Sequence, residues 1–400
     1  MKKYLNIKHS IVIFSVLILS LFIFFSITFA TSTWTQVNDS GFGDATNVGT
    51  YPIATFNNYI YAGTYNGAGG QVWRSSNGTT WTQTNESGFG DANNLATYSG
   101  IEFNGYLYIG TINGTTGAEV WKSANGANWT QANTDGFGSS SNEAILAAEA
   151  FNNYLYVATY NTVTGTQVWR TSDGESWDQA QDASGFGSIN NIYCNSLYQF
   201  GNYLYAFTQN FVNGTQVWRT SNGLNWTQVN ENGFGDADNF ESLSRATFNN
   251  EMYVGTGNIN GGQLYKTTNG TTWTQITGID VLKVNNQVIM PIQTTSNHIY
   301  IGTANTNDGG EIWISTNGSS WTQDNNSGFG DTDNIAALPY AILGNYIYAG
   351  TYNGTTGGQI WRSQIPSTPT PTPTSDTEDS DSSSDSTSLT TLPRTGAHAK

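Results

Sequence analysis

The sequence predicts an all-β fold, a seven-bladed β-propeller of four-stranded antiparallel blades, from three observations. A unit typified by residues 56–94 (FNNYIYAGTYNGAGGQVWRSSNGTTWTQTNESGFGDANN) recurs along the chain, as expected for blades, whose periods are about 40–50 residues. All 13 tryptophans fall in two columns of this repeat, and equivalent tryptophans of its WTQ element are 47 to 49 residues apart. The last copy stops early, and its missing WTQ element stands alone before the first copy.

Each copy reads as four strands joined by turns. In the first copy we expect an irregular apolar strand at 48–56, an alternating strand at 59–64, and two short strands at 71–75 and 81–84. Asn57-Asn58 and Asn77-Gly78 predict two-residue turns, because both residue types tolerate positive φ. The other connections are longer, from Asn66 to Gly70 within the blade and from Glu86 to Asn94 between blades.

The two ends of the repeat region predict how the ring closes. The last copy ends after its third strand, at 359–363, and Trp34-Thr35-Gln36 has the sequence of a fourth strand. An N-terminal strand should therefore complete the last blade, so that the propeller occupies residues 31–365. A closed ring leaves only short sheet edges, which suits four-stranded sheets that cannot bury both faces alone.

Composition excludes several functions. The formal net charge is −16 and only 10% of residues are charged, so no basic stripe is available for a nucleic-acid partner. Cys194 is the single cysteine, which rules out an internal disulfide. His298 replaces a repeat tyrosine and is the sole histidine of the propeller, so we expect no histidine-based or zinc site.

The N-terminal 30 residues read as a secretory signal peptide. Three lysines precede an apolar run from Ile11 to Phe25, and Thr28 and Ala30 suit a cleavage site. The alternative is an uncleaved membrane anchor, because the apolar run approaches spanning length. We expect cleavage, and hence a secreted, extracellular protein.

The C-terminal part departs in composition from the repeats. Residues 366–391 alternate proline with serine and threonine and then become a serine–aspartate tract, which predicts an extended, disordered stalk. Residues 392–400 begin with Leu392-Pro393-Arg394-Thr395-Gly396. This resembles the LPxTG sorting signal of sortase-anchored surface proteins, and the resemblance implies a sortase partner and attachment to the cell wall. The family pattern continues with a hydrophobic span and a basic tail, whereas only Ala-His-Ala-Lys follows here. We expect that the tail is truncated; the alternative is that sorting fails and the product is released.

The turn before each WTQ strand resembles the Asp-box, or BNR, hairpin of sialidase-type propellers. In residues 171–177, Gly174 stands three before Trp177 as in that family, but the acidic position is adjacent to glycine and is asparagine in most copies. The likeness covers six of seven blades. It implies a structural turn whose side chain caps its own hairpin, and it supports the fold more than an activity.

Sialidase chemistry would need three converging arginines, which the repeat disfavours. Arg74, Arg170, Arg219 and Arg362 all follow a repeat tryptophan, so symmetry spreads them around the ring, and only Arg245 lies off register. Acids in or near the innermost strands break the symmetry: Glu102, Glu143, Glu149 and Glu241. We interpret them as hydrated channel groups and keep paired-carboxylate glycoside hydrolysis as the alternative.

The recurring Ser-Gly-Phe-Gly-Asp loop places a phenylalanine where it can fill the gap between adjacent blades. Residues 236–239 and 331–334 offer alternate oxygen ligands, so calcium is a possible cofactor, although turn capping explains them better. Otherwise we predict no cofactor and no metal.

The face that carries the long loops, with the central mouth, is the predicted binding site. The expected ligand-binding residues are aromatic residues of these loops and charged residues of the inner strands: Tyr65, Tyr160, Phe211, Tyr352, Glu149, Glu241 and Arg245. The sequence thus predicts a monomeric, non-enzymatic binding or adhesion module for a glycan or a surface protein. A carbohydrate-active enzyme and a structural surface coat are the alternatives.

Overall fold

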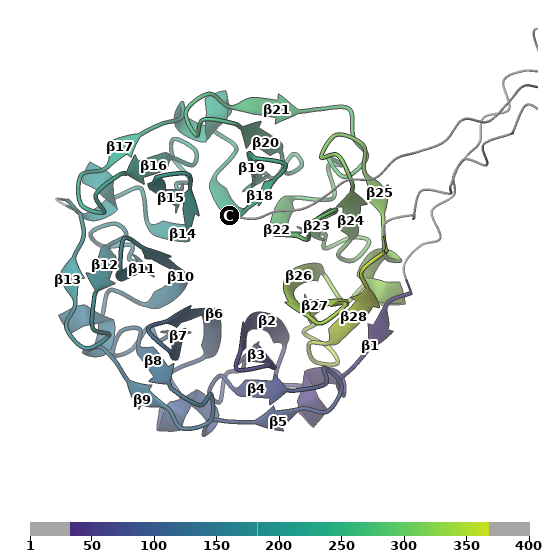
Figure 1. Ribbon diagram of the computed structural model, residues 1–400, viewed down its shortest axis with the longest axis horizontal. Coiled ribbons are helices and arrows are strands. Elements are labelled where there is room, and N and C mark those ends of the chain that lie inside the picture. The colour runs from purple at the N-terminus through teal and green to yellow at the C-terminus, as the bar shows by residue number, and fades with distance from the viewer. Residues whose placement is uncertain (1–32, 182, 368–400) are drawn as a thin grey trace, which may run out of the picture. The chain divides into compact units, whose positions relative to one another are not determined.

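The computed structural model describes residues 33–181 and 183–367, which form an all-β ring (Figure 1). The predicted signal peptide, the stalk beyond residue 367 and the motif Leu392–Gly396 lie outside the described residues. Within the described part of the chain, no helix is long and apolar enough to cross a membrane.

Consecutive strands form antiparallel groups of four, each named after its first strand. The strands, in chain order, are β1 (Thr35–Gln36); β2 (Gly49–Phe56), β3 (Tyr59–Tyr65), β4 (Val72–Ser75) and β5 (Thr82–Gln83); β6 (Ala96–Phe103), β7 (Tyr106–Ile112), β8 (Val120–Ser123) and β9 (Thr130–Gln131); β10 (Ala144–Phe151), β11 (Tyr154–Tyr160), β12 (Val168–Thr171) and β13 (Asp178–Gln179); β14 (Tyr193–Phe200), β15 (Tyr203–Gln209), β16 (Val217–Thr220) and β17 (Thr227–Gln228); β18 (Glu241–Phe248), β19 (Glu251–Gly257), β20 (Leu264–Thr267) and β21 (Thr274–Ile276); β22 (Val288–Thr294), β23 (Ile299–Ala304), β24 (Ile312–Ser315) and β25 (Thr322–Gln323); β26 (Ala336–Leu343), β27 (Tyr346–Tyr352) and β28 (Ile360–Gln364).

The first two strands of each group join their neighbours into a closed inner ring of 14 strands. Tyr160, at the end of β11, pairs with Ala144 of its own group and with Tyr193 of the next. The same double pairing closes the circle, where Tyr352 pairs with Ala336 and with Gly49. The shorter third and fourth strands lie outside this ring (Figure 1). The arrangement is consistent with a propeller.

The predicted N-terminal closure is confirmed by the strand pairing. β1 is antiparallel to β28, with Thr35 opposite Arg362 and Gln36 opposite Trp361. The amide of Val37 donates to the carbonyl of Ile360 at 2.8 Å. The Trp34 Nε1 also donates to Asp324 at 3.0 Å, which ties the first strand to the preceding group.

The two predicted tight turns differ from each other. Asn57 and Asn58 both adopt positive φ, at 48° and 62°, as predicted. The prediction for Asn77-Gly78 is wrong, because only Gly78 has positive φ (69°), and β4 and β5 are separated by residues 76–81. The Asn77 Oδ1 instead accepts the amides of Thr79 and Thr80 at 2.9 and 2.8 Å. A side-chain cap therefore shapes this turn.

A column of buried tyrosines explains the glycine of that turn. The second strand of every group carries one tyrosine that is at most 2% exposed. It is the second residue of β23 and the third residue of the other six second strands. These tyrosines are Tyr61, Tyr108, Tyr156, Tyr205, Tyr253, Tyr300 and Tyr348. A Cβ at Gly126, in the turn of the β6 group, would overlap the hydroxyl of Tyr61 from the β2 group. The same overlap relates Gly78 to Tyr348 across the closure. The glycine thus provides both positive φ and space for a neighbouring ring.

The phenylalanine of the Ser-Gly-Phe-Gly-Asp loop packs between neighbouring groups. The Phe42 ring stacks on Trp73 with centroids 4.4 Å apart and meets Trp81 edge-on at 5.7 Å. The Trp81 Nε1 donates to the carbonyl of Val37 in the preceding group at 2.9 Å. This three-ring cluster recurs around the ring, with Tyr265 in place of tryptophan beside Phe234.

Candidate functional site

A cavity of about 690 Å³ lies at the ring mouth, on the side of the long loops. Its walls come from the beginnings of the first strands and the ends of the second strands, such as Tyr51 of β2 and Tyr65 of β3. Because successive residues of a strand point to opposite faces, the lining residues within one strand alternate, as do Tyr193 and Asn195 of β14. The cavity is within the size range of small-molecule sites, about 300–1,000 Å³.

β-Bulges direct side chains into this cavity. The pairing of every first strand with its second strand shifts near the third to fifth residue. In β14 the skipped residue is Asn195, and in β26 it is Tyr340; both line the cavity. An unpaired bulge residue is free of the ladder and turns its side chain, so bulges commonly occur at functional sites.

The aromatic residues that line this cavity are all tyrosines. Seven of them line the cavity: Tyr51, Tyr65, Tyr98, Tyr160, Tyr193, Tyr340 and Tyr352. Tyr51 and Tyr98 stack with centroids 4.3 Å apart, and Tyr160 meets Tyr193 edge-on at 5.0 Å. Burial raises the pKa of Tyr51, Tyr98, Tyr193 and Tyr340, so these phenols are neutral hydrogen-bonding groups at physiological pH.

A polar cluster lies on one side of the cavity. Glu241 is 7% exposed, and its Oε2 accepts from Gln209 Nε2 at 2.7 Å and from Asn195 Nδ2 at 3.3 Å. Burial raises the pKa of Glu241 to about 7, although these two bonds act in the opposite direction. Two buried atoms of this side, the Tyr193 hydroxyl and the Asn195 Oδ1, have no hydrogen-bond partner among the described residues. They are available to a ligand.

The structure brings four of the seven predicted ligand-binding residues to this cavity: Tyr65, Tyr160, Tyr352 and Glu241. Phe211 does not line it; its ring stacks on Phe240 at 5.0 Å and is 62% exposed. Whether any of these residues binds a ligand stays a prediction.

Glu149 and Arg245 do not line the cavity. Burial raises the pKa of Glu149 to about 7, and the positive charge of Arg245 acts against that rise. Arg245 donates to the carbonyl of Leu197 from Nε at 3.3 Å and from Nη2 at 3.2 Å. It lies four residues after Glu241 on β18, roughly 13 Å along the strand. Arg245, Glu149 and Glu241 therefore do not form one cluster.

The repeated arginines lie away from the axis, as their register predicts. The guanidinium groups of Arg74, Arg170, Arg219 and Arg362 each lie over a tyrosine ring of their own group at 4.2–4.6 Å. Arg74, Arg219 and Arg362 also donate to a turn carbonyl of the next group. These three guanidinium groups are thus held where two groups meet, and the four arginines do not converge.

The acidic loops use their carboxylates to hold neighbouring loops. Asp236 Oδ1 accepts the amide of Asp238 at 3.0 Å, while Oδ2 accepts from Asn258 and Gln263 at 3.2 and 2.8 Å. In the part of the chain that the structure describes, no group of three or more histidine, cysteine, aspartate or glutamate side chains could hold a metal. Calcium binding by these loops stays a prediction.

Several cavity residues were missed by sequence reasoning. Tyr51, Tyr98, Asn195 and Met290 occupy the third position of their first strands, and Tyr340 the fifth position of its own. The sequence held a signal for the third position. In chain order this position of the first strands is Tyr, Tyr, Leu, Asn, Leu, Met and Leu, while most of the repeat is regular. Divergence within a regular repeat marks positions where the fold does not dictate the residue.

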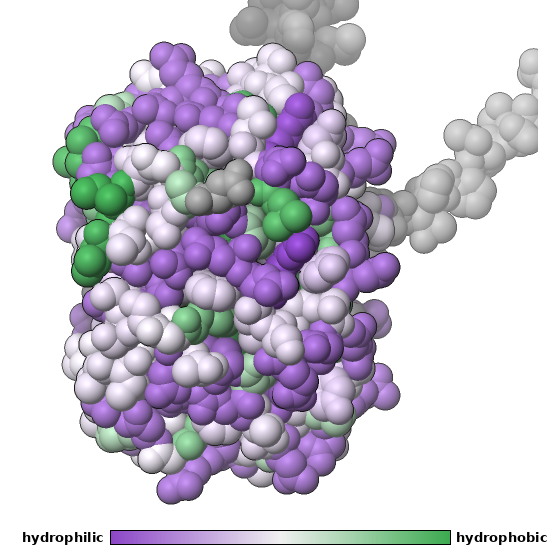
Figure 2. Space-filling view, turned by 90° about the vertical axis from the view of Figure 1, so that its left-hand side faces the viewer, coloured by the Kyte–Doolittle hydropathy of each residue, from purple (hydrophilic) through white to green (hydrophobic). Residues whose placement is uncertain are grey.

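The loops around the mouth also expose apolar side chains. Those of Val163, Ile189, Phe211, Val212, Ile259 and Val284 are 62–65% exposed, and all lie in the long loops of this face. Figure 2, a side view, shows hydrophobic residues along the upper part of its left edge, against a mainly hydrophilic surface. Exposed apolar residues that gather in one place mark an interaction surface more often than scattered ones.

No family model and no curated protein sequence matches this chain. Solved structures do resemble it. A catalytically inactive virginiamycin B lyase from Staphylococcus aureus, solved with quinupristin, has a TM-score of 0.61 at 11% identity, over 84% of this chain and 99% of that one. A streptogramin B lyase has a TM-score of 0.58 at 9% identity, over 82% and 96%. A lectin from Burkholderia pseudomallei has a TM-score of 0.58 at 11% identity, over 83% and 96%. At such identities the likeness shows a propeller-like fold and nothing of the activity.

Proposed function

We propose that this chain is a seven-bladed β-propeller whose central cavity binds a neutral glycan without catalysing a reaction. The four-stranded groups are its blades, and β1 supplies the outer strand of the β26 group. The number of blades is supported by the strand pairing and by the 47- to 49-residue spacing of the tryptophans.

The observation that carries the proposal is the chemistry of the cavity wall. The faces of tyrosine rings suit the C–H faces of a sugar ring. Beside these rings, the Tyr193 hydroxyl and the Asn195 Oδ1 have no hydrogen-bond partner among the described residues. An unpaired buried polar atom costs about 1–3 kcal/mol, so hydroxyl groups that satisfy both atoms would gain affinity. Among residues 33–181 and 183–367, no arginine or lysine lines the cavity, which disfavours an acidic sugar.

Secretion and wall attachment rest on the sequence alone. The apolar N-terminal segment with three lysines and the Leu392–Gly396 motif support display outside the cell, with a sortase as partner. In this proposal the protein is a monomer that presents its mouth at the end of a stalk. Light scattering of the secreted product and mass analysis of wall digests would test these points.

The binding proposal is tested by a glycan array followed by calorimetry on the best ligand. We expect Tyr160→Ala to weaken binding at least 10-fold, because the ring is part of the wall and donates no structural hydrogen bond. Phe211→Ala is the matched control, since its aromatic ring lies on the same face but outside the cavity, and should change affinity less than 2-fold. Equal effects of the two substitutions would contradict the central site.

Two specific observations favour other functions. Glu143 and Glu241 both line the cavity, as a carbohydrate-active enzyme would require of its two carboxylates. A hydrolysis assay on the same glycans decides this, because turnover that Glu241→Gln abolishes would establish an enzyme.

The apolar residues around the mouth suit a protein ligand instead, and pull-down with surface proteins would then succeed where the glycan array fails. If the glycan array, the hydrolysis assay and the pull-down all give no signal, a structural role in a surface coat is the remaining alternative.

A further inference from the structure

A second kind of cavity occurs on the rim of the ring, between the outermost strands of neighbouring groups. One of about 570 Å³ lies between β1 and β5, and another of about 410 Å³ lies between β9 and β13. A smaller one of about 150 Å³ lies between β13 and β17. All three lie far along the sheet from the axis, and none shares a lining residue with the central cavity.

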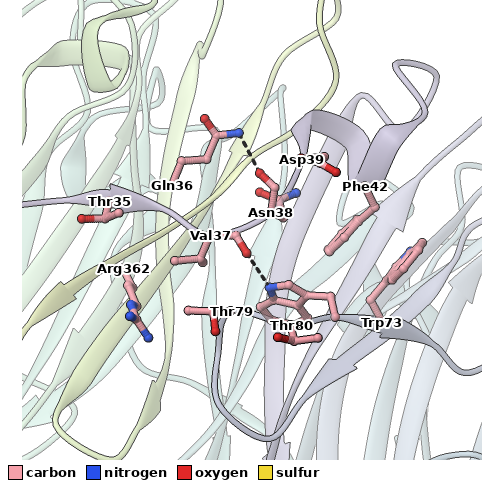
Figure 3. Close-up of a pocket in the computed structure, with 11 residues that line it drawn as sticks. Thr35, Gln36, Val37, Asn38, Asp39, Phe42, Trp73, Thr79, Thr80 and Arg362 are labelled. Carbon is pink, nitrogen blue, oxygen red and sulfur yellow. Dashed lines mark hydrogen bonds between the residues drawn. The ribbon is translucent and has the colours of Figure 1, made fainter.

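The three rim cavities have the same walls because the repeat builds them. Each is lined by a phenylalanine, two tryptophans and a side-chain amide: Phe42, Trp73, Trp81 and Asn38; Phe137, Trp169, Trp177 and Asn133; Phe186, Trp218, Trp226 and Gln181. Figure 3 shows the Phe42 ring beside Trp73, with Asn38 and Gln36 above and Thr79 and Thr80 below. The aromatic rings are only partly buried.

These walls are fixed before any ligand arrives. The phenylalanine stacks on the first tryptophan with centroids 4.4, 4.7 and 5.1 Å apart, and meets the second edge-on at 5.7, 5.5 and 5.5 Å. Each amide oxygen accepts a backbone amide, that of Ile360, Val120 or Val168, at 2.6–2.7 Å. Rigid aromatic walls lower the entropic cost of binding.

The charged side chains of the two larger cavities are already engaged or balanced. The Arg362 guanidinium lies 4.5 Å from the Tyr346 ring centroid and donates to the carbonyl of Asn77 at 3.3 Å, while Asp39 lies in the same cavity. Glu175 forms an ion pair with Lys122. The cavities therefore favour an uncharged ligand.

We infer that the two larger rim cavities are equivalent binding sites for the neutral sugar rings that end a glycan. A sugar ring offers an apolar C–H face to the aromatic rings and hydroxyl groups to threonine side chains and backbone groups of the same cavity. The Leu224 side chain narrows the third cavity, which falls below the volume of ordinary small-molecule sites, about 300 Å³. The protein would then bind glycan surfaces through several sites on one rigid frame, which raises avidity without stronger single contacts.

The experiment measures how many sugar-binding sites the full chain has. The probes are the methyl glycosides of mannose, galactose, fucose and N-acetylglucosamine, titrated by calorimetry and by ligand-observed NMR. We expect one of them to bind at two or more sites per chain. Thr79→Trp, which fills the larger rim cavity from its exposed edge, should remove one site and change the affinity of the others less than 2-fold.

Two control variants separate this inference from the proposed function. Thr116→Trp alters an exposed turn threonine of the opposite, long-loop face and should leave the number of rim sites unchanged. Leu146→Trp fills the central cavity and should abolish only the binding there. If none of the glycosides binds to a chain that melts normally, or if Thr79→Trp removes no site, the rim cavities are not sugar sites, whatever the central cavity does.

Discussion

At the scale of single residues, two glutamates have carboxyl groups that burial keeps protonated. Burial raises the pKa of both Glu241 and Glu149 to about 7. The folded protein therefore holds protons on these groups at a pH where the unfolded chain, with a glutamate pKa near 4.5, has released them. Stability then falls as pH rises from about 4.5 to about 7.

Glu241→Gln should remove part of this pH dependence. Glutamine resembles the protonated acid, so the variant should match the wild type near pH 4.5 and be more stable at pH 8, by roughly 3 kcal/mol at most, since each pKa unit is about 1.4 kcal/mol. Thermal melts from pH 4.5 to 8 measure this. A variant whose melting temperature follows the same pH curve as the wild type would contradict a buried, protonated Glu241.

Gly126 and Gly105 provide a second residue-level test. Both have positive φ, at 66° and 79°, but a Cβ at Gly126 would overlap the Tyr61 hydroxyl while a Cβ at Gly105 would meet nothing within 4 Å. Gly105→Ala should cost about 1–2 kcal/mol for the backbone alone. Gly126→Ala should cost about 1–3 kcal/mol more because of the overlap. Chemical denaturation measures both, and equal costs would contradict the packing of the tyrosine column.

At the scale of strands and turns, the sequence predicted the strand bounds well, because the repeat and the turn residues both mark where strands end. The strand bounds of the first copy agree with the prediction to within one residue at each end. The turn at Asn77 was misread, because Asn-Gly predicts a tight turn only if the asparagine takes positive φ. Here its side chain accepts two backbone amides instead, which single-sequence propensity does not reveal.

The pairing of β1 with β28 can be locked covalently. Thr35 lies opposite Arg362, and directly opposed antiparallel residues have Cα atoms about 4.5–5.5 Å apart, as a disulfide requires. We expect T35C/R362C to crosslink on oxidation. Because the bridge closes a very long loop, it should raise Tm by roughly 5–10 °C relative to the reduced form. Failure to crosslink in the folded protein would show that these strands are not neighbours.

At the scale of the whole molecule, the period predicted the ring and the interrupted last copy predicted its closure. The composition of the cavity was harder to foresee. Symmetry fixes residues that recur around the ring, such as the buried tyrosine column and the stacked phenylalanine. It says nothing of the axis, where the third position of the first strands varies among tyrosine, leucine, asparagine and methionine. Phe211 lies on the predicted long-loop face but outside the cavity, because loop membership alone does not show which aromatic residues turn toward the mouth.

Removing the closing strand should weaken the entire ring. Deletion of residues 31–44 leaves the edge of β28 unpaired and removes Trp34, whose ring centroid lies 5.6 Å from that of Phe329. The lost apolar burial corresponds to about 4–6 kcal/mol as an upper value. We expect a sharply lower Tm and self-association through the open edge of β28. Scanning calorimetry with light scattering measures both, and a monomer with an unchanged melt would contradict closure by β1.

The central claim is that the cavity at the mouth of the ring binds a neutral glycan, and a crystal structure with the best ligand of the glycan array tests it most directly. The account predicts sugar density in the cavity, within hydrogen-bonding distance of the Tyr193 hydroxyl and of Asn195, whether or not the rim cavities are also occupied. A cavity that holds only water while the glycan is bound elsewhere would contradict it.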